Sequence, residues 1–234
     1  MRLLITRPEP DATRTAQALR ARGHEVLVAP LLATLAIAAD FAGPYDGVLM
    51  TSANAARALT AHPRARELAR LPCFTVGGRT AEAARTAGFA DTISADGAVG
   101  DLVDLVAARF DRSARLLYLA GEDRAGDLGG DLAQRGIVVD TAVIYRALAA
   151  EKLPAHLTEA LRHRNLDGAL HYSPRSVAIL LAHAGHNGAV PALTGIAHYC
   201  LSEEVAVPLR GGGVSRIHVA ARPDEASLLA LIPE

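Results

Sequence analysis

The feature that most constrains the fold is a regular alternation between two kinds of segment. Short runs rich in Val, Ile and Leu alternate with Ala- and Arg-rich stretches whose apolar residues recur at helical spacing. This alternation is typical of α/β proteins, because each crossover between parallel strands needs a helix. Two five-stranded sheets suit 234 residues better than a single ten-stranded sheet. The runs predict strands at 3–6, 24–29, 47–51, 73–76, 91–94, 115–119, 138–145, 168–172, 195–199 and 216–219.

Helices are predicted between most of these strands. The first begins near Asp11, a candidate N-cap, and ends at Gly23. Two more are predicted over 101–109 and 127–135. Later helices carry Leu157 with Leu161, and Leu228 with Leu231, on their buried faces.

Two parts of the chain repeat each other. Residues 46–59 read DGVLMTSANAARAL and residues 167–180 read DGALHYSPRSVAIL, so Ser52 and Ser173 each lie six positions after an aspartate. The segments VGGRTAEAARTAG and YCLSEEVAVPLRGGG, which follow in order, each end in a glycine eight positions after Thr80 or Val205. Two ordered matches indicate two similar α/β lobes descended from a duplicated unit.

Each repeat delivers a hydroxyl side chain to the turn between a strand and a helix. Ser173 precedes Pro174, which favours an N-cap followed by proline at the first helical position. Ligands of parallel sheets bind at the carboxyl ends of strands, and helix N-termini attract anions. Two facing lobes would therefore form a cleft suited to carboxylates or phosphates. The alternative is that these hydroxyls only cap helices.

Composition and missing motifs narrow the classes of function. Lys and Arg number 24 against 25 Asp and Glu, so no overall charge attracts nucleic acid or a membrane surface. Cys73 and Cys200 read as buried thiols of a reducing compartment, and no apolar stretch reaches membrane-spanning length. A cytoplasmic protein is expected. No nucleotide, metal or nucleophile motif is recognisable, so no cofactor and no metal are expected.

A set of short motifs adds a family resemblance over nearly the whole chain. In order they are TRP at 6–8, TSANA at 51–55, VGGRTA at 76–81, LAGEDRAGDL at 119–128, VIYRA at 143–147 and HYSPRSV at 171–177. Together they resemble the uroporphyrinogen-III synthase family. The resemblance implies a hydro-lyase of haem, sirohaem and cobalamin biosynthesis. Its substrate, hydroxymethylbilane, is a linear tetrapyrrole with eight carboxylates, cyclised with inversion of the last pyrrole ring and loss of water, without a cofactor.

The resemblance also implies an architecture. Two flavodoxin-like or Rossmann-like lobes, each with a parallel five-stranded sheet, would be joined by a two-strand linker, with the site in the cleft between them. Residues 1–35 and 148–234 would form the lobe that holds both chain ends, and residues 36–147 the other. A monomer that binds a small molecule is expected, with no nucleic acid or membrane partner.

The resemblance assigns roles to individual residues. Tyr145 in VIYRA matches the family's candidate general acid, which would protonate or hydrogen-bond the departing hydroxyl; the alternative is a hinge tyrosine packed between lobes. Ser52, Thr80 and Ser173 match polar positions at the cleft. Arginines in motif turns are candidate partners for substrate carboxylates, or else solvated surface charges: Arg7, Arg79, Arg124 and Arg175.

One turn departs from the family pattern. Residues 201–206 read LSEEVA where the family has Gly-x-x-Thr-Ala, so Ser202 is the candidate replacement for a missing hydroxyl. Glu203 and Glu204 would repel substrate carboxylates and are expected to point away from the cleft. Two other functions stay open at this stage: a two-lobed small-molecule binding protein without turnover, and an inactive paralogue.

Overall fold

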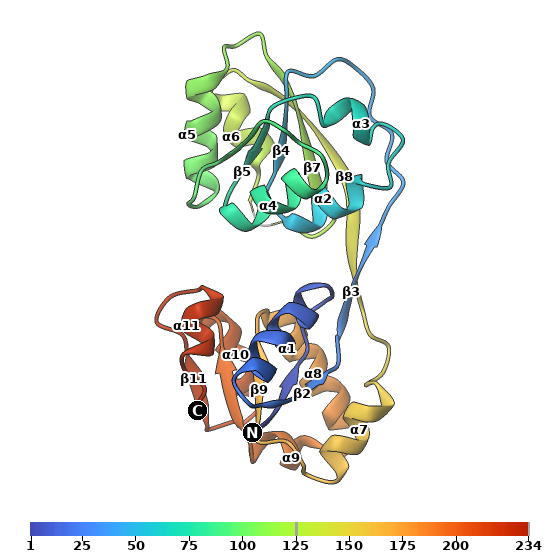
Figure 1. Cartoon of the computed structure of the whole chain (residues 1–234), viewed down its shortest axis with the longest axis vertical. Helices are drawn as coiled ribbons and strands as arrows, with labels where there is room; N and C mark the ends of the chain where they lie inside the picture. The colour runs from blue at the N-terminus through green and yellow to red at the C-terminus, as the bar shows by residue number, and fades with distance from the viewer. Residues whose placement is uncertain (125, 234) are drawn as a thin grey trace. The chain divides into compact units, whose positions relative to one another are not determined.

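The computed structural model describes residues 1–124 and 126–233, and its chain forms two compact units. Unit 1 comprises Met1–Ala33 and Leu148–Glu234, and unit 2 comprises Thr34–Ala147. Ala125 of the LAGEDRAGDL motif and the terminal Glu234 lie outside the described residues. Each unit is a sheet covered by helices on both faces (Figure 1).

Unit 1 is built on a five-stranded sheet in which every neighbouring pair runs parallel. Its central strands are buried along nearly their whole length, as expected for a parallel sheet with helices on both faces. The spatial order is β11 (Ile217–Val219), β10 (Ala197–Cys200), β9 (Gly168–His171), β1 (Arg2–Ile5) and β2 (Glu25–Val28).

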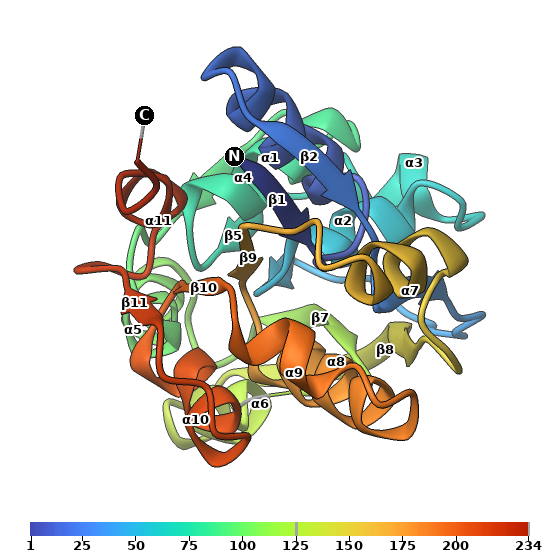
Figure 2. The same cartoon turned by 90° about the horizontal axis from the view of Figure 1, so that it is seen from below.

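Helices of unit 1 form two layers (Figure 2). One layer contains α1 (Asp11–Ala21) and α11 (Glu225–Leu229). The other contains α7 (Ala155–Arg162), α8 (Pro174–His186), α9 (Val190–Thr194) and α10 (Glu203–Gly211). The prediction that Asp11 caps α1 is wrong: Pro10 occupies the N-cap position, and the Asp11 carboxylate forms ion pairs with Arg7 and Arg14.

Unit 2 has a six-stranded mixed sheet, which corrects the prediction of five parallel strands. The additional strand is β3 (Leu32–Ala36), at the edge beside β8 (Val138–Ala149). Ile37 N donates to Ile144 O and Ala150 N donates to Leu31 O, so residue numbers run in opposite directions and the pair is antiparallel. The remaining order is β7 (Arg115–Gly121), β4 (Gly47–Met50), β5 (Cys73–Thr75) and β6 (Thr92–Ser94), all parallel.

Helices cover both faces of the unit 2 sheet (Figure 1). On one face lie α2 (Ala53–Leu59), α3 (Ala65–Leu68) and α4 (Gly78–Thr86). On the other lie α5 (Val99–Arg109) and α6 (Leu128–Gln134). None of the helices in the described part of the chain is long and apolar enough to cross a bilayer.

The two sheets share one spatial order when the repeat segments are aligned. With β4 matched to β9, the orders β6-β5-β4-β7-β8 and β11-β10-β9-β1-β2 coincide strand for strand. In unit 1 the strands that match β7 and β8 come first in the chain. The chain order reverses between β4 and β7 in one sheet and between β9 and β1 in the other. Such a reversal marks where ligands bind in open α/β sheets.

The Asp-Gly pair of each repeat has the same structural task in both units. Asp46 accepts a hydrogen bond from Arg115 N at 2.8 Å, and Asp167 accepts one from Arg2 N at 2.6 Å. A Cβ added to the following glycine would lie 3.3 Å from Leu116 Cδ2 in unit 2 and 3.2 Å from Leu3 Cδ2 in unit 1. The repeat therefore fixes how the central strands begin.

Candidate active site

Three of the predicted site residues lie at the carboxyl edge of the unit 2 sheet. Ser52 directly precedes α2 in the turn after β4, Thr80 lies in the first turn of α4 after β5, and Arg124 follows β7. These strands are neighbours and parallel, so their carboxyl ends share one edge. Thr80 is buried, whereas Arg124 is exposed.

Tyr145 reaches the same edge from β8 because that strand contains a bulge. Ala120 pairs with Val143 and Gly121 pairs with Tyr145, which leaves Ile144 as an extra residue. A bulge interrupts the alternation of side chains and re-aims the residues beside it. As a result Tyr145 packs against the same apolar cluster as Ile144, although the two are consecutive.

The ring of Tyr145 lies directly on the backbone of Gly121. A Cβ added at Gly121 would lie 2.6 Å from Tyr145 Cζ and 2.8 Å from its Oη, far inside van der Waals contact. Only glycine therefore leaves room for the phenol in this position. Sequence reasoning did not single out Gly121, although it lies within the LAGEDRAGDL motif.

The phenol of Tyr145 is held in its protonated form. Burial raises the pKa of Tyr145 above its usual value, and a hydrogen bond with the Ser52 side chain opposes this shift without cancelling it. Nearby, Thr51 Oγ1 and Tyr118 Oη are 2.9 Å apart. The carboxyl edge of unit 2 thus carries a cluster of hydroxyl groups: Thr51, Ser52, Tyr118 and Tyr145.

The Ser52 side chain both caps a helix and contacts Tyr145, although capping and a role at the site were predicted as alternatives. Its side chain accepts a hydrogen bond from Asn54 N at 3.2 Å, which caps α2. The same side chain contacts Tyr145. Helix capping therefore places the hydroxyl where it can orient the phenol.

The serines of unit 1 differ from Ser52. Ser173 occupies the N-cap position of α8, with Pro174 as the first helical residue as predicted, but its side chain makes no capping hydrogen bond. Ser202 stands at the N-cap of α10 and likewise makes no capping bond. Capping alone therefore does not explain these two hydroxyls.

Among the charged residues singled out in the turns of unit 1, three are exposed and one is buried. Arg175 is exposed in the first turn of α8. Glu203 is exposed and forms an ion pair with Arg210 at 2.7 Å, while Glu204 is exposed beside it. Arg7, in contrast, is buried just after β1.

Arg7 takes part in a network within unit 1. Its Nη1 lies 3.0 Å from Glu225 Oε1 and 3.1 Å from Thr15 Oγ1. Its guanidinium carbon lies 3.8 Å from the centre of the Tyr172 ring, in cation–π geometry. The sequence did not single out Thr15, Tyr172 or Glu225; of these only Tyr172 lies within a quoted motif.

Other groups in the described chain offer less to a polar substrate. A hollow of about 430 Å³ near Phe41 and His62 contains none of the predicted site residues. Burial raises the pKa of the Cys73 and Cys200 thiols to about 12, so neither is a thiolate at neutral pH. Among the described residues, no group of three His, Cys, Asp or Glu side chains is placed to hold a metal ion.

Comparison with known protein families identifies one that matches most of the chain. A family model described as HEM4, uroporphyrinogen-III synthase HemD, matches residues 13–230. No curated protein matches the chain by sequence.

Solved structures with the same fold span nearly the full chain. Uroporphyrinogen-III synthetase from Helicobacter pylori 26695 is 17% identical, with a TM-score of 0.68 over 99% of this chain and 98% of that one. A mutant uroporphyrinogen III synthase from the extremely thermophilic bacterium Thermus thermophilus is 20% identical, with a TM-score of 0.54 over 98% and 96%. At these identities the likeness shows a shared α/β fold.

Proposed function

The chain belongs to the uroporphyrinogen-III synthase family, cyclising hydro-lyases of tetrapyrrole biosynthesis, and on that premise we propose that Tyr145 serves as its proton donor. The observation that carries the proposal is the phenol itself. It is partly buried, it is kept protonated, and it lies on Gly121 in contact with Ser52 at the carboxyl edge of the sheet.

The chemistry requires a donor of this kind and little more. Hydroxymethylbilane loses its terminal hydroxyl as water when the electron-rich pyrrole forms an azafulvene. A protonated phenol beside the departing oxygen would donate its proton, or a hydrogen bond, as the carbon–oxygen bond breaks. The pyrrole expels the hydroxyl readily, so the rest of the task is to hold the two chain ends together in a productive fold. Hence no single residue need be indispensable.

Substrate carboxylates would bind to polar groups at strand ends. In unit 1 the candidates are the N-termini of α8 and α10, with Ser173, Ser202 and the exposed Arg175. In unit 2 they are Thr80 and the exposed Arg124. Support comes from Ser173 and Ser202, whose side chains are not engaged in capping bonds.

Our proposal includes the family's architecture. Residues 1–35 with 148–234 and residues 36–147 would be its two lobes, β3 and β8 its two-strand linker, and the substrate would lie between the lobes. The protein would act as a monomer in the cytoplasm. Two observations support this proposal: the chain passes from one unit to the other only within β3 and β8, and those strands pair.

Product analysis tests the function. Purified protein would be supplied with hydroxymethylbilane, freshly made by the preceding enzyme, and the cyclised products separated by isomer. We expect uroporphyrinogen III in excess over the type I isomer, which forms spontaneously. Type I alone, from protein shown to be folded, would favour a binding protein or an inactive paralogue.

A further inference from the structure

One carboxylate in unit 1 is held by four different side chains. Glu225 Oε1 lies 3.0 Å from Arg7 Nη1 and 3.2 Å from Tyr172 Oη, and it accepts a hydrogen bond from Thr15 Oγ1. Glu225 Oε2 lies 3.1 Å from Arg14 Nη2. Two guanidinium groups and two hydroxyls therefore converge on one carboxylate. Such a donor set recognises a carboxylate in the way that arginine-lined substrate sites do.

This donor set lies where a substrate site is expected. Arg7 comes two residues after the end of β1, and Tyr172 comes directly after β9. These neighbouring strands are the pair between which the chain order of the unit 1 sheet reverses. Arg14 and Thr15 lie in the first turns of α1, the helix that follows β1.

We propose that Arg7, Arg14, Thr15 and Tyr172 form a carboxylate-binding site that Glu225 fills in the free protein, and that a carboxylate of the substrate replaces Glu225 on binding. The identity of that ligand rests on the proposed function. The existence of the site does not, because Glu225 already shows that it accepts a carboxylate.

Exposure decides which member of the network can leave. The Arg7 side chain is 6% exposed, whereas those of Glu225 and Arg14 are 29% and 47% exposed. Solvent therefore reaches the network through Glu225 and Arg14, and an incoming carboxylate meets Arg7 once Glu225 has turned away.

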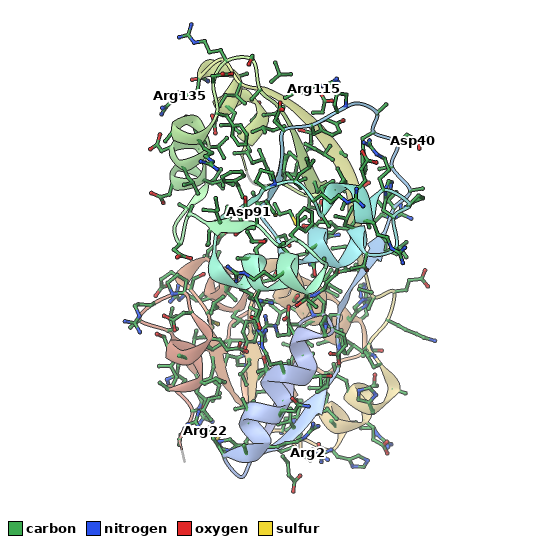
Figure 3. All side chains as sticks on the ribbon, turned by 45° about the horizontal axis from the view of Figure 1, so that its top comes forward. Arg2, Arg22, Asp40, Asp91, Arg115 and Arg135 are labelled. Atoms are coloured by element: carbon green, nitrogen blue, oxygen red, sulfur yellow. The ribbon has the colours of Figure 1, made fainter. Side chains whose placement is uncertain are left out.

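The helix that carries Glu225 need not move. Leu228 of α11 is fully buried. Arg22, which Figure 3 labels, donates hydrogen bonds to Leu229 O at 2.6 Å and Ile232 O at 3.1 Å. Rotation of the Glu225 side chain at the first position of α11 is sufficient.

Electrostatics favours exchange of one carboxylate for another over simple departure. The network contains two cations, Arg7 and Arg14, and two anions, Asp11 and Glu225. Among the described residues, loss of Glu225 alone would leave the buried Arg7 with Asp11 as its one ion-pair partner, whose carboxylate oxygen is 3.7 Å away. A substrate carboxylate restores the balance, so Glu225 competes with substrate and raises the concentration needed for binding.

The first test uses acetate as a substitute carboxylate and needs no enzyme activity. Glu225→Ala vacates the site, and thermal unfolding is followed in sodium acetate and in sodium chloride of equal ionic strength. We expect acetate to raise the Tm of this variant by about 3 °C at tenfold excess over its Kd, with a further rise that follows the logarithm of the acetate concentration, and to leave the wild type unchanged. The matched control is Glu203→Ala, which also breaks an ion pair with an arginine, but at an exposed position.

A further variant ties the effect to the site. Thr15→Val combined with Glu225→Ala removes one of the donors, and the acetate effect should shrink. The proposed binding site would be overturned if acetate did not raise the Tm of Glu225→Ala, or if it raised the Tm of Glu225→Ala, Glu203→Ala and the wild type equally.

The second test addresses exchange with substrate. Glu225→Gln keeps the size of the side chain but loses its charge, and it guards against misfolding of the alanine variant. We expect KM for hydroxymethylbilane to fall, on the order of fivefold, with kcat little changed. An unchanged or higher KM would show that Glu225 is structural and would overturn the exchange. Absence of turnover in the wild type as well would instead refute the proposed function and leave the acetate result standing.

Discussion

When β4 is aligned with β9, Ser52 is equivalent to Ser173 and Thr51 to Tyr172. In the neighbouring strands Leu116 is equivalent to Leu3, and four positions later Ala120 is equivalent to Arg7. At the amino ends of the central strands the two units are alike, since Asp46 and Asp167 accept equivalent backbone hydrogen bonds. At the carboxyl ends they differ. Unit 2 presents hydroxyl groups around Tyr145, whereas unit 1 presents an ionic network around Arg7.

The difference shows how one framework can be adapted to two tasks. The Asp-Gly pairs at which the central strands begin are the same in both units, and they determine how the strands of each sheet are aligned. Residues just beyond the strands determine what that edge can bind or donate, and they have diverged. In the proposed enzyme unit 2 supplies a proton and unit 1 supplies charge for carboxylates.

The largest effect is expected from the proton donor of unit 2. Tyr145→Phe removes only the hydroxyl and should lower kcat by about 100-fold, near the lower end for a general acid because the leaving group departs readily. Steady-state kinetics with product isomer analysis would measure it. The control Tyr45→Phe removes another buried hydroxyl of unit 2, bonded to Asp140, and should have little effect. Wild-type kinetics for Tyr145→Phe would remove the phenol from the mechanism.

The next largest effect is expected from substitution in the ionic network of unit 1. Arg7→Met should lower the free energy of unfolding by about 2 kcal/mol, because a partly buried Glu225 loses its buried partner but keeps Arg14. Urea denaturation would measure this loss. Arg115→Met breaks an exposed ion pair with Asp140 in unit 2 and should cost less than about 1 kcal/mol. Equal costs would mean that burial does not distinguish the two arginines.

Gly121 tests whether the position of the phenol matters as well as its presence. Gly121→Ala must push the Tyr145 ring away from its place, and we expect kcat to fall roughly tenfold. The double variant with Tyr145→Phe should be little worse than Tyr145→Phe alone, because both changes act on the same group. Additive losses in the double variant would show that Gly121 acts in another way.

A smaller contrast separates the two serines. Ser52→Ala should destabilise the protein by about 1 kcal/mol, the usual cost of losing a helix cap, whereas Ser173→Ala should change stability by under about 0.5 kcal/mol. Both values come from urea unfolding curves. A cost for Ser173→Ala as large as that for Ser52→Ala would erase the contrast.

The smallest effect concerns acid stability. Burial would raise the pKa of Glu225, but the Thr15 hydroxyl and the charges of Arg7 and Arg14 hold it below its usual value. A depressed pKa in the folded state contributes stability above the unfolded value of about 4.3, and this is lost as pH falls through the folded pKa. Glu225→Gln should therefore flatten the decline of the unfolding free energy in acid. A decline as steep as that of the wild type would assign it to other carboxylates.

Much of the fold could be predicted because its strands are short and almost wholly apolar. All ten predicted strands are present; the bounds of nine agree within two residues, and β8 extends four residues beyond its predicted end at 145. Strand β3 was missed because its sequence, LATLA, is buried only at Leu32, and it pairs at an edge. Its antiparallel pairing with β8 depends on contacts between distant segments, which local patterns do not reveal.

The candidate site was predictable only in part. Ser52 and Tyr145 were both singled out, and the structure adds that their side chains meet. Gly121 was missed because a glycine shows its importance only through the ring that lies on it. Glu225 was missed because it lies 218 positions from Arg7 and belongs to no recognisable motif. Close packing and long-range ion pairs are tertiary properties.

The shared strand order has a consequence for how the chain is made. Unit 2 is one continuous stretch, so all of its parallel strands have been synthesised once β8 is complete. In unit 1, β1 and β2 are synthesised first, but β1 also borders β9, and Asp167 just before β9 accepts a hydrogen bond from Arg2 N across 165 positions. Strand β1 must therefore stay unpaired on the side of β9 while all of unit 2 is translated. Vectorial synthesis thus allows the half that carries Tyr145 to fold first and obliges the half that carries Arg7 to fold last.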